Sequence, residues 1–150
     1  IYWWSESQNV YLNPDSSMMF CGLPYLTDII GLSSLKTNYT NNMEAILCVM
    51  TQNQKLKNFD ALSNWNTENV TNLECAFAGY INLENIEGLT NWNTSKVTNM
   101  HGMLGGDFDM GGSEIRDITP LKKWDVSNVV DMSYTFARSG RFVANNELEC

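Results

Sequence analysis

Basic residues are scarce in this chain. Only 9 of its 150 residues are Lys or Arg, against 17 Asp and Glu, and the formal net charge is −8. Proteins that bind nucleic acid need clustered Lys and Arg to contact phosphates, and an anionic membrane surface attracts the same clusters. No apolar run approaches the length of about 18 residues that spans a bilayer. The composition therefore argues against nucleic acid as a partner and against membrane insertion of this segment.

Catalytic and metal-binding patterns are missing too. His101 is the single histidine, and no acidic residue lies beside it in the sequence. The cysteines form no Cys-x-x-Cys pair, so the zinc-binding spacings do not occur. The glycines at 105–112 lack the Lys-Ser or Lys-Thr that follows a phosphate-binding loop. Because catalysis needs convergent groups, we expect no enzyme, no cofactor and no metal site.

What the chain does contain is an internal repeat. The segment WNTENVTNL at 65–73 returns as WNTSKVTNM at 92–100 and as WDVSNVVDM at 124–132. A large apolar residue follows each copy by four residues, and the resulting series has intervals of 27, 30, 27 and 32 residues: Phe20, Leu47, Phe77, Leu104 and Phe136. Leucine-rich repeats have periods of about 20 to 29 residues. We therefore expect successive coils in which these apolar anchors stack in one column.

A second apolar series lies between the anchors, with one apolar residue every three positions. It occupies residues 26–35, 56–65, 83–92 and 115–124. Each segment is short and bounded by polar residues, which predicts one short strand per coil, paired in parallel with its neighbours. Segments such as 72–77 predict about two turns of helix on the opposite side. The expected fold class is an α/β repeat: a leucine-rich-repeat-like solenoid with one short parallel strand and one short helix per coil.

The repeat also predicts the domain organisation. Residues 1–14 precede the first anchor and are expected to form a lead-in or cap strand. Residues 15–138 form a solenoid of four to five coils, and residues 139–150 are a C-terminal tail or a truncated next repeat.

Two columns of Asn and Asp accompany the apolar ones. The first lies five residues before each anchor and consists of Asp15, Asn42, Asn72, Asn99 and Asp131. Asn and Asp are the best helix N-caps, so we expect these side chains to cap the predicted helices. A calcium ladder is the alternative, but the three neutral Asn residues disfavour it. The second column consists of Asp28, Asn58, Asn85 and Asp117; it is expected to link coil to coil or, alternatively, to face a ligand.

The repeat units resemble a known family. LENIEGLTNWNTSKVTNM at 83–100 and ITPLKKWDVSNVVDMSYTF at 118–136 are similar to the BspA-like leucine-rich repeats of bacterial surface proteins, which also occur in mycoplasma lipoproteins. The resemblance covers about residues 10–136 and departs from the pattern at residues 39–41 and at Gly102 and Leu104. It implies a curved solenoid displayed outside a bacterial cell, often as one module of an adhesin that engages host proteins.

The repeat places some of the cysteines at equivalent positions. Cys21 and Cys48 each follow an anchor by one residue, so they occupy the same place in consecutive coils. Paired strands lie about 4.8 Å apart, and a disulfide needs Cα atoms about 4.4 to 6.8 Å apart, so this pair is a disulfide candidate. Cys75 is a rival partner for Cys48, and buried unpaired thiols are the remaining alternative.

We therefore predict a binding module and keep one rival. A repeat array presents exposed strand positions that vary without disturbing the core. The expected partner-contacting positions form two rows: Thr27, Lys57, Glu84 and Arg116, then Ile30, Asp60, Glu87 and Thr119. The expected partner is a host or neighbouring-cell surface or matrix protein, and the expected location is extracellular. The rival is a structural spacer or a self-assembling fibre subunit, because open array ends leave strands and core exposed.

Overall fold

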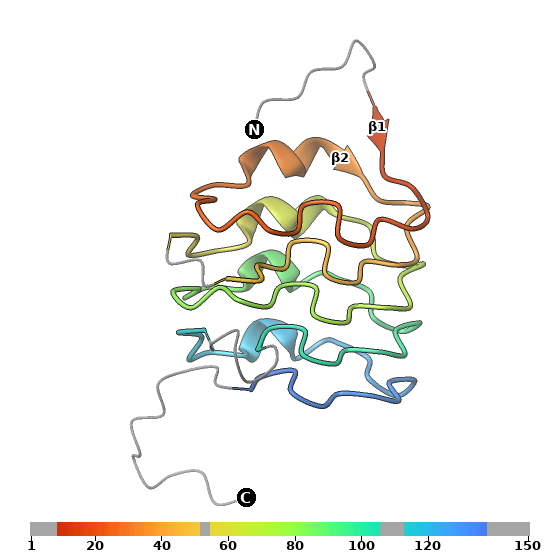
Figure 1. The fold of residues 1–150 in the computed structure, drawn as a ribbon. Helices are drawn as coiled ribbons and strands as arrows, with labels where there is room; N and C mark the ends of the chain where they lie inside the picture. The colour runs from red at the N-terminus through yellow and green to blue at the C-terminus, as the bar shows by residue number, and fades with distance from the viewer. Residues whose placement is uncertain (1–8, 52–54, 106–112, 138–150) are drawn as a thin grey trace, which may run out of the picture.

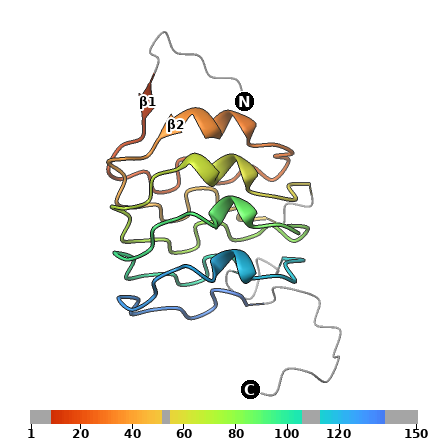
Figure 2. The ribbon, with the colours of Figure 1, turned by 180° about the vertical axis from the view of Figure 1, so that it is seen from behind.

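The computed structural model describes residues 9–51, 55–105 and 113–137. In these residues the chain winds into a stack of coils (Figure 1). The elements are β1 (Val10–Tyr11), η1 (Ile30–Ser34), β2 (Leu35–Lys36), η2 (Asp60–Asn64), η3 (Glu87–Leu89) and η4 (Thr119–Leu121), where η denotes a 3₁₀-helix. β1 pairs in parallel with β2, with Val10 opposite Leu35. The four 3₁₀-helices lie one above another along one side of the stack (Figure 2).

The 3₁₀-helices replace the strands expected in the three-residue apolar series. Three residues per turn is the period of a 3₁₀-helix, so residues such as Ile29 and Leu32 fall on one buried side. The preceding Asx residue assists each start, since Asp28 Oδ1 accepts a hydrogen bond from Ile30 N–H at 2.8 Å. Within these apolar series, strand-like pairing among the described residues is limited to the Val10–Leu35 pair of β1 and β2 and to one bridge between Asn58 and Asn85.

The opposite side also differs from the expectation, because the described residues contain no α-helix. Each coil there donates alternate backbone N–H groups to the next coil: Leu73 N–H to Asn99 O (2.9 Å), and Cys75 N–H to His101 O (2.8 Å). Because these N–H groups donate to another coil, they are not available for the bonds to the residue four positions earlier that form an α-helix. Between these bonds the backbone makes tight turns whose repeated residue has φ of 50° to 59°: Met18, Ala45, Cys75, Gly102 and Tyr134.

The apolar anchors occupy the same place in successive coils. Phe20 N–H donates to Ile46 O, and Leu47 N–H donates to Ala76 O, each time to the residue just before the next anchor. The series Asp15, Asn42, Asn72, Asn99 and Asp131 is joined throughout by parallel bridges. Leu47, Phe77 and Leu104 are buried, whereas Phe136 in the last described coil is 36% exposed. The repeat alignment is thus confirmed by the coil-to-coil bonding.

The core fills the space between the two sides and has its own aromatic column. Trp65, Trp92 and Trp124 stack with ring centroids 6.2 and 6.4 Å apart and nearly parallel planes. Each indole N–H donates to a backbone carbonyl of the preceding coil, as Trp92 Nε1 does to Leu62 O at 3.2 Å. A buried Trp needs a partner for its N–H, so this bond fixes both the ring and the spacing of the coils.

The predicted boundaries at the two ends remain predictions. Residues 1–8 and 138–150 lie outside the described residues, and with them most of the expected lead-in and the whole expected tail. Val10–Tyr11, at the end of the expected lead-in, pairs with β2 of the second coil.

Candidate binding surface

The eight predicted partner-contacting residues lie on the side of the stack that carries the 3₁₀-helices, and all of them are exposed. One row is the first residue of each 3₁₀-helix: Ile30, Asp60, Glu87 and Thr119. The other row precedes it by three residues: Thr27, Lys57, Glu84 and Arg116. We call these two rows the η face. The structure therefore places the predicted residues together, although on 3₁₀ turns and not on a sheet.

Two open hollows mark the η face. The first, of about 570 Å³, lies between η1 and η2, and Thr27, Ile30, Lys57 and Asp60 line it. The second, of about 520 Å³, is lined by Lys57, Asn82, Glu84, Glu114, Arg116 and Asp117. Both hollows share Lys57, so they follow one another along the stack. Sequence reasoning missed Asn82 and Glu114 because they lie just outside the two rows that the repeat defines.

The charges of the η face are mixed and partly paired. Lys57 Nζ contacts Glu84 Oε1 in an ion pair whose side chains are about 60% exposed. Arg116 contacts Glu114 at 3.7 Å. Exposed ion pairs contribute little to stability, so these side chains can exchange their partners for groups of another molecule at small cost. The face therefore suits a polar macromolecular partner that carries both signs of charge.

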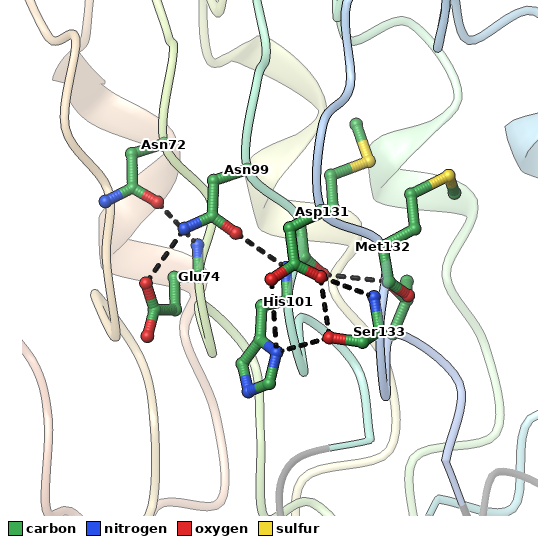
Figure 3. A network of polar contacts seen from close by, with 9 residues as sticks. Asn72, Glu74, Asn99, His101, Asp131, Met132 and Ser133 are labelled. Atoms are coloured by element: carbon green, nitrogen blue, oxygen red, sulfur yellow. Dashed lines mark hydrogen bonds and ion pairs between the residues drawn. The ribbon is translucent and has the colours of Figure 1, made fainter.

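The first Asx column lies on the opposite side and is bound internally. Each side-chain oxygen accepts from the backbone N–H two residues later, as Asn99 Oδ1 does from His101 at 2.9 Å. The amides also donate between coils, and Asn99 Nδ2 donates to Glu74 Oε2 at 2.8 Å (Figure 3). The predicted helix N-cap role needs correction, because the capped N–H belongs to a tight turn and no α-helix follows it in the described residues. The column stabilises turns and joins coils.

A His-Ser-Asp contact closes this network at its last coil. His101 Nδ1 lies 2.7 Å from Ser133 Oγ and 3.8 Å from Asp131 Oδ2 (Figure 3). The Ser133 hydroxyl donates to Asp131 Oδ1 at 2.6 Å. Bonds from Ser133, and then the nearby His101, lower the pKa of Asp131. The Ser133 hydroxyl therefore links the His101 ring to the Asp131 carboxylate across the last two described coils.

The second Asx column lies beside the η face. Besides Asp28, Asp117 Oδ1 accepts from Thr119 N–H at 2.8 Å, and this bond lowers the Asp117 pKa. Asn58 and Asn85 make the same bond at η2 and η3. These oxygens therefore already accept hydrogen bonds from the first backbone N–H group of each 3₁₀-helix. Asn58 and Asp117 also line the hollows.

The structure brings three of the four cysteines together. Cys21 and Cys75 pack, half-buried, against the buried Cys48. The three are unbridged in this structure, so the Cys21–Cys48 disulfide stays a prediction, and Cys150 lies outside the described residues. Among the described residues no group of three His, Cys, Asp or Glu side chains is placed to hold a metal ion, and no helix has the length and apolarity to cross a membrane.

Comparison with known proteins identifies the family. A family model described as "Mycoplasma protein of unknown function, DUF285" matches residues 17–114 and again residues 41–149. The chain belongs to the DUF285 family. Two overlapping matches of one model are what internal repetition produces in a DUF285 chain, in agreement with the bonded coils. No curated protein and no solved structure matches this DUF285 chain significantly.

Proposed function

We propose that this chain is a BspA-like leucine-rich-repeat module of an extracellular bacterial surface protein, and that it binds another protein through the η face. The observation that carries the proposal is the η face itself, which has two exposed rows of residues, mixed charge and two consecutive hollows along these rows. The partner we propose is a surface or matrix protein of a host or a neighbouring cell. The resemblance of the repeats supports the extracellular location, and the scarcity of basic residues disfavours nucleic acid.

The η face extends along the stack and is held in place by the fold. A stable protein–protein interface takes about 800 Å² from each partner, and the two hollows extend over four successive coils. The 3₁₀-helices are held by coil-to-coil contacts and by their Asx residues. Little conformational entropy is therefore lost when a partner docks, and low ordering cost favours affinity.

The test is a comparison of variants on immobilised extracellular matrix proteins by surface plasmon resonance. In the first variant the eight η-face residues are changed to Ser. In the control, three exposed residues of another column are changed: Thr71→Ser, Thr98→Ser and Val130→Ser. We expect the η-face variant to lose at least about tenfold in affinity, which is about 1.4 kcal/mol, and the control to bind like the unchanged chain. Equal binding by all three chains would exclude the η face.

The second candidate is a structural spacer or a self-assembling fibre subunit. It is favoured by the exposed apolar side chains of the last described coil: Val126, Val130, Met132, Tyr134 and Phe136. However, a second copy that continued the ladder would place its Asp15 against Asp131, whereas each internal junction has at least one Asn. This carboxylate pair disfavours end-to-end stacking at neutral pH. Light scattering decides, because a fibre subunit grows with protein concentration and the binding module stays a monomer.

A further inference from the structure

Three thiols from three consecutive coils meet beside the turn column. Gly22 N–H donates to Cys48 O at 2.8 Å, so Cys21 and Cys48 lie side by side in adjacent coils. Their thiols are close enough to hydrogen-bond to each other. Cys75 belongs to the next coil and starts the turn in which Ala78 N–H donates to Cys75 O. Ala78 and Cys48 belong to one buried cluster, and Cys75 packs against that cluster.

Burial distinguishes the central thiol from its two neighbours. Cys48 is 1% exposed, while Cys21 and Cys75 are half-buried and open to small molecules. Burial, followed by the proximity of Cys21 and Cys75, raises the pKa of Cys48 to about 12. Since the thiolate is the reactive form, an external reagent meets Cys21 or Cys75 first. Cys48 lies between them as the one sulfur that both can reach.

We propose that Cys48 is the shared sulfur of an exchangeable disulfide, paired either with Cys21 or with Cys75. The inference is independent of the proposed binding face. Cys21 and Cys48 occupy the same place in paired coils, which lie about 4.8 Å apart, within the Cα separation of about 4.4 to 6.8 Å that a disulfide needs. Cys75 lies three residues before Ala78, the residue equivalent to Cys48, and packs against the same buried cluster across the turn. Cys21 and Cys75 are separated by the coil of Cys48, about twice that distance, and do not pair with each other.

The oxidant is a low-molecular-weight disulfide such as glutathione disulfide. The Cys21 thiolate attacks it, forms a mixed disulfide and releases one glutathione; Cys48 then attacks the Cys21 sulfur and releases the second. Two cysteine thiols are oxidised to one disulfide, glutathione disulfide is reduced to two glutathiones, and these take up the two protons. Attack of Cys75 on the Cys48 sulfur breaks the Cys21–Cys48 bond, forms Cys48–Cys75 and frees the Cys21 thiolate. That exchange consumes no oxidant.

The test uses the full chain with Cys150→Ser, so that every internal pair comes from the three described thiols. The folded protein is equilibrated with glutathione disulfide, quenched with acid and mapped by non-reducing mass spectrometry. We expect both Cys48 disulfides and no Cys21–Cys75 disulfide. Cys75→Ser leaves only Cys21–Cys48 and raises Tm by roughly 5–10 °C on oxidation, because the closed loop constrains the unfolded chain.

The decisive variant is Cys48→Ser, in which Cys21 and Cys75 are expected to carry glutathione and no internal bond. The same oxidation in urea is the matched control: there the Cys21–Cys75 pair forms as well, since the unfolded chain brings any two cysteines together. A folded chain that carries glutathione on Cys21 and Cys75 with an unmodified Cys48 thiol would overturn the proposal. So would a Cys21–Cys75 disulfide as abundant in the folded chain as in urea.

Discussion

Replacing Asn99 by Asp tests the Asx column with the smallest possible change. Asn99 Nδ2 donates to Glu74 Oε2 at 2.8 Å, while its Oδ1 accepts from His101 N–H at 2.9 Å. The aspartate keeps the shape and the Oδ1 acceptor. It replaces the donor by a second carboxylate oxygen that faces the Glu74 carboxylate. The turn is therefore preserved, and only the bond between coils becomes repulsive.

The magnitude follows from the geometry. Two unit charges about 4 Å apart repel by about 1 kcal/mol at the dielectric constant of water and by about 4 kcal/mol at an effective value of 20. Asn99 and Glu74 are half-buried, so the lower part of this range applies. The lost hydrogen bond adds about 1 kcal/mol. We expect Asn99→Asp to lower the free energy of unfolding by about 2 kcal/mol at neutral pH.

Urea unfolding at low and high salt measures this loss. In 1 M salt the Debye length falls to about 3 Å, so we expect the loss to shrink by about half. The matched control is Asn66→Asp, whose Oδ1 likewise accepts from a backbone N–H, that of Glu68 at 3.0 Å. Its repeat position in the preceding coil holds Lys36, so the new charge meets no acid there. Equal losses in both variants, or a loss that salt leaves unchanged, would refute the reasoning.

Two further substitutions probe the backbone and the core. Gly79→Ala is expected to cost about 3 kcal/mol in urea unfolding, because Gly79 has φ of 94° and an added Cβ would lie 2.3 Å from Val49 O. Gly22→Ala is the control, because Gly22 has φ of 78° and open space around it, and it should lower the free energy of unfolding by only about 1 kcal/mol. Similar losses at both glycines would show that the close approach to Val49 does not matter. Trp92→Phe loses its bond to Leu62 O and should lower stability by about 1–2 kcal/mol; an unchanged urea midpoint would show that the indole N–H does not fix the coil spacing.

The columns could be predicted from the sequence because each residue type recurs wherever the environment recurs. A position buried in one coil is buried in the next, so anchors such as Leu47 and Phe77 repeat as large apolar residues. The exposed rows follow from the same register, and the eight η-face residues are indeed exposed. The period alone thus places a residue inside or outside, before any secondary structure is assigned.

The elements themselves could not be predicted in this way. An apolar residue at every third position matches the period of a 3₁₀-helix better than the two-residue period of a strand, so the strand prediction rests on the shortness of the segments and not on their spacing. The bond between Asp28 and Ile30 N–H that starts the helix is visible only in the structure. On the other side, the N–H of Leu73 bonds to Asn99 of the next coil. The helix propensity of one segment cannot predict whether its N–H groups bond within the segment or to the next coil, because the competing acceptor belongs to another repeat.

The parts of the candidate site that sequence reasoning missed have the same origin. His101 has no acidic neighbour in the sequence, yet it contacts Asp131 and Ser133 from the following coil. The second hollow likewise lies between coils, because Lys57, Glu84 and Arg116 line it from three different coils. Such contacts depend on the length of the loop between the coils, and the segment 106–112 before η4 is longer than its counterparts.

The distribution of Asn and Asp along the first Asx column follows from these contacts between coils. An amide accepts and donates at once, so an inner residue such as Asn72 can accept from its own turn and donate to Glu44 of the preceding coil. A carboxylate can only accept, and it repels carboxylates in both neighbouring coils. Asp15 and Asp131 each have a neighbouring coil on one side only within the described stack. Asn42 Nδ2 of one neighbour donates to Asp15 Oδ1 at 3.1 Å, and His101 Nδ1 of the other lies 3.8 Å from Asp131 Oδ2. In this column, therefore, each Asn with described coils on both sides uses its amide to donate to a carboxylate of the preceding coil, a bond that Asp could not make.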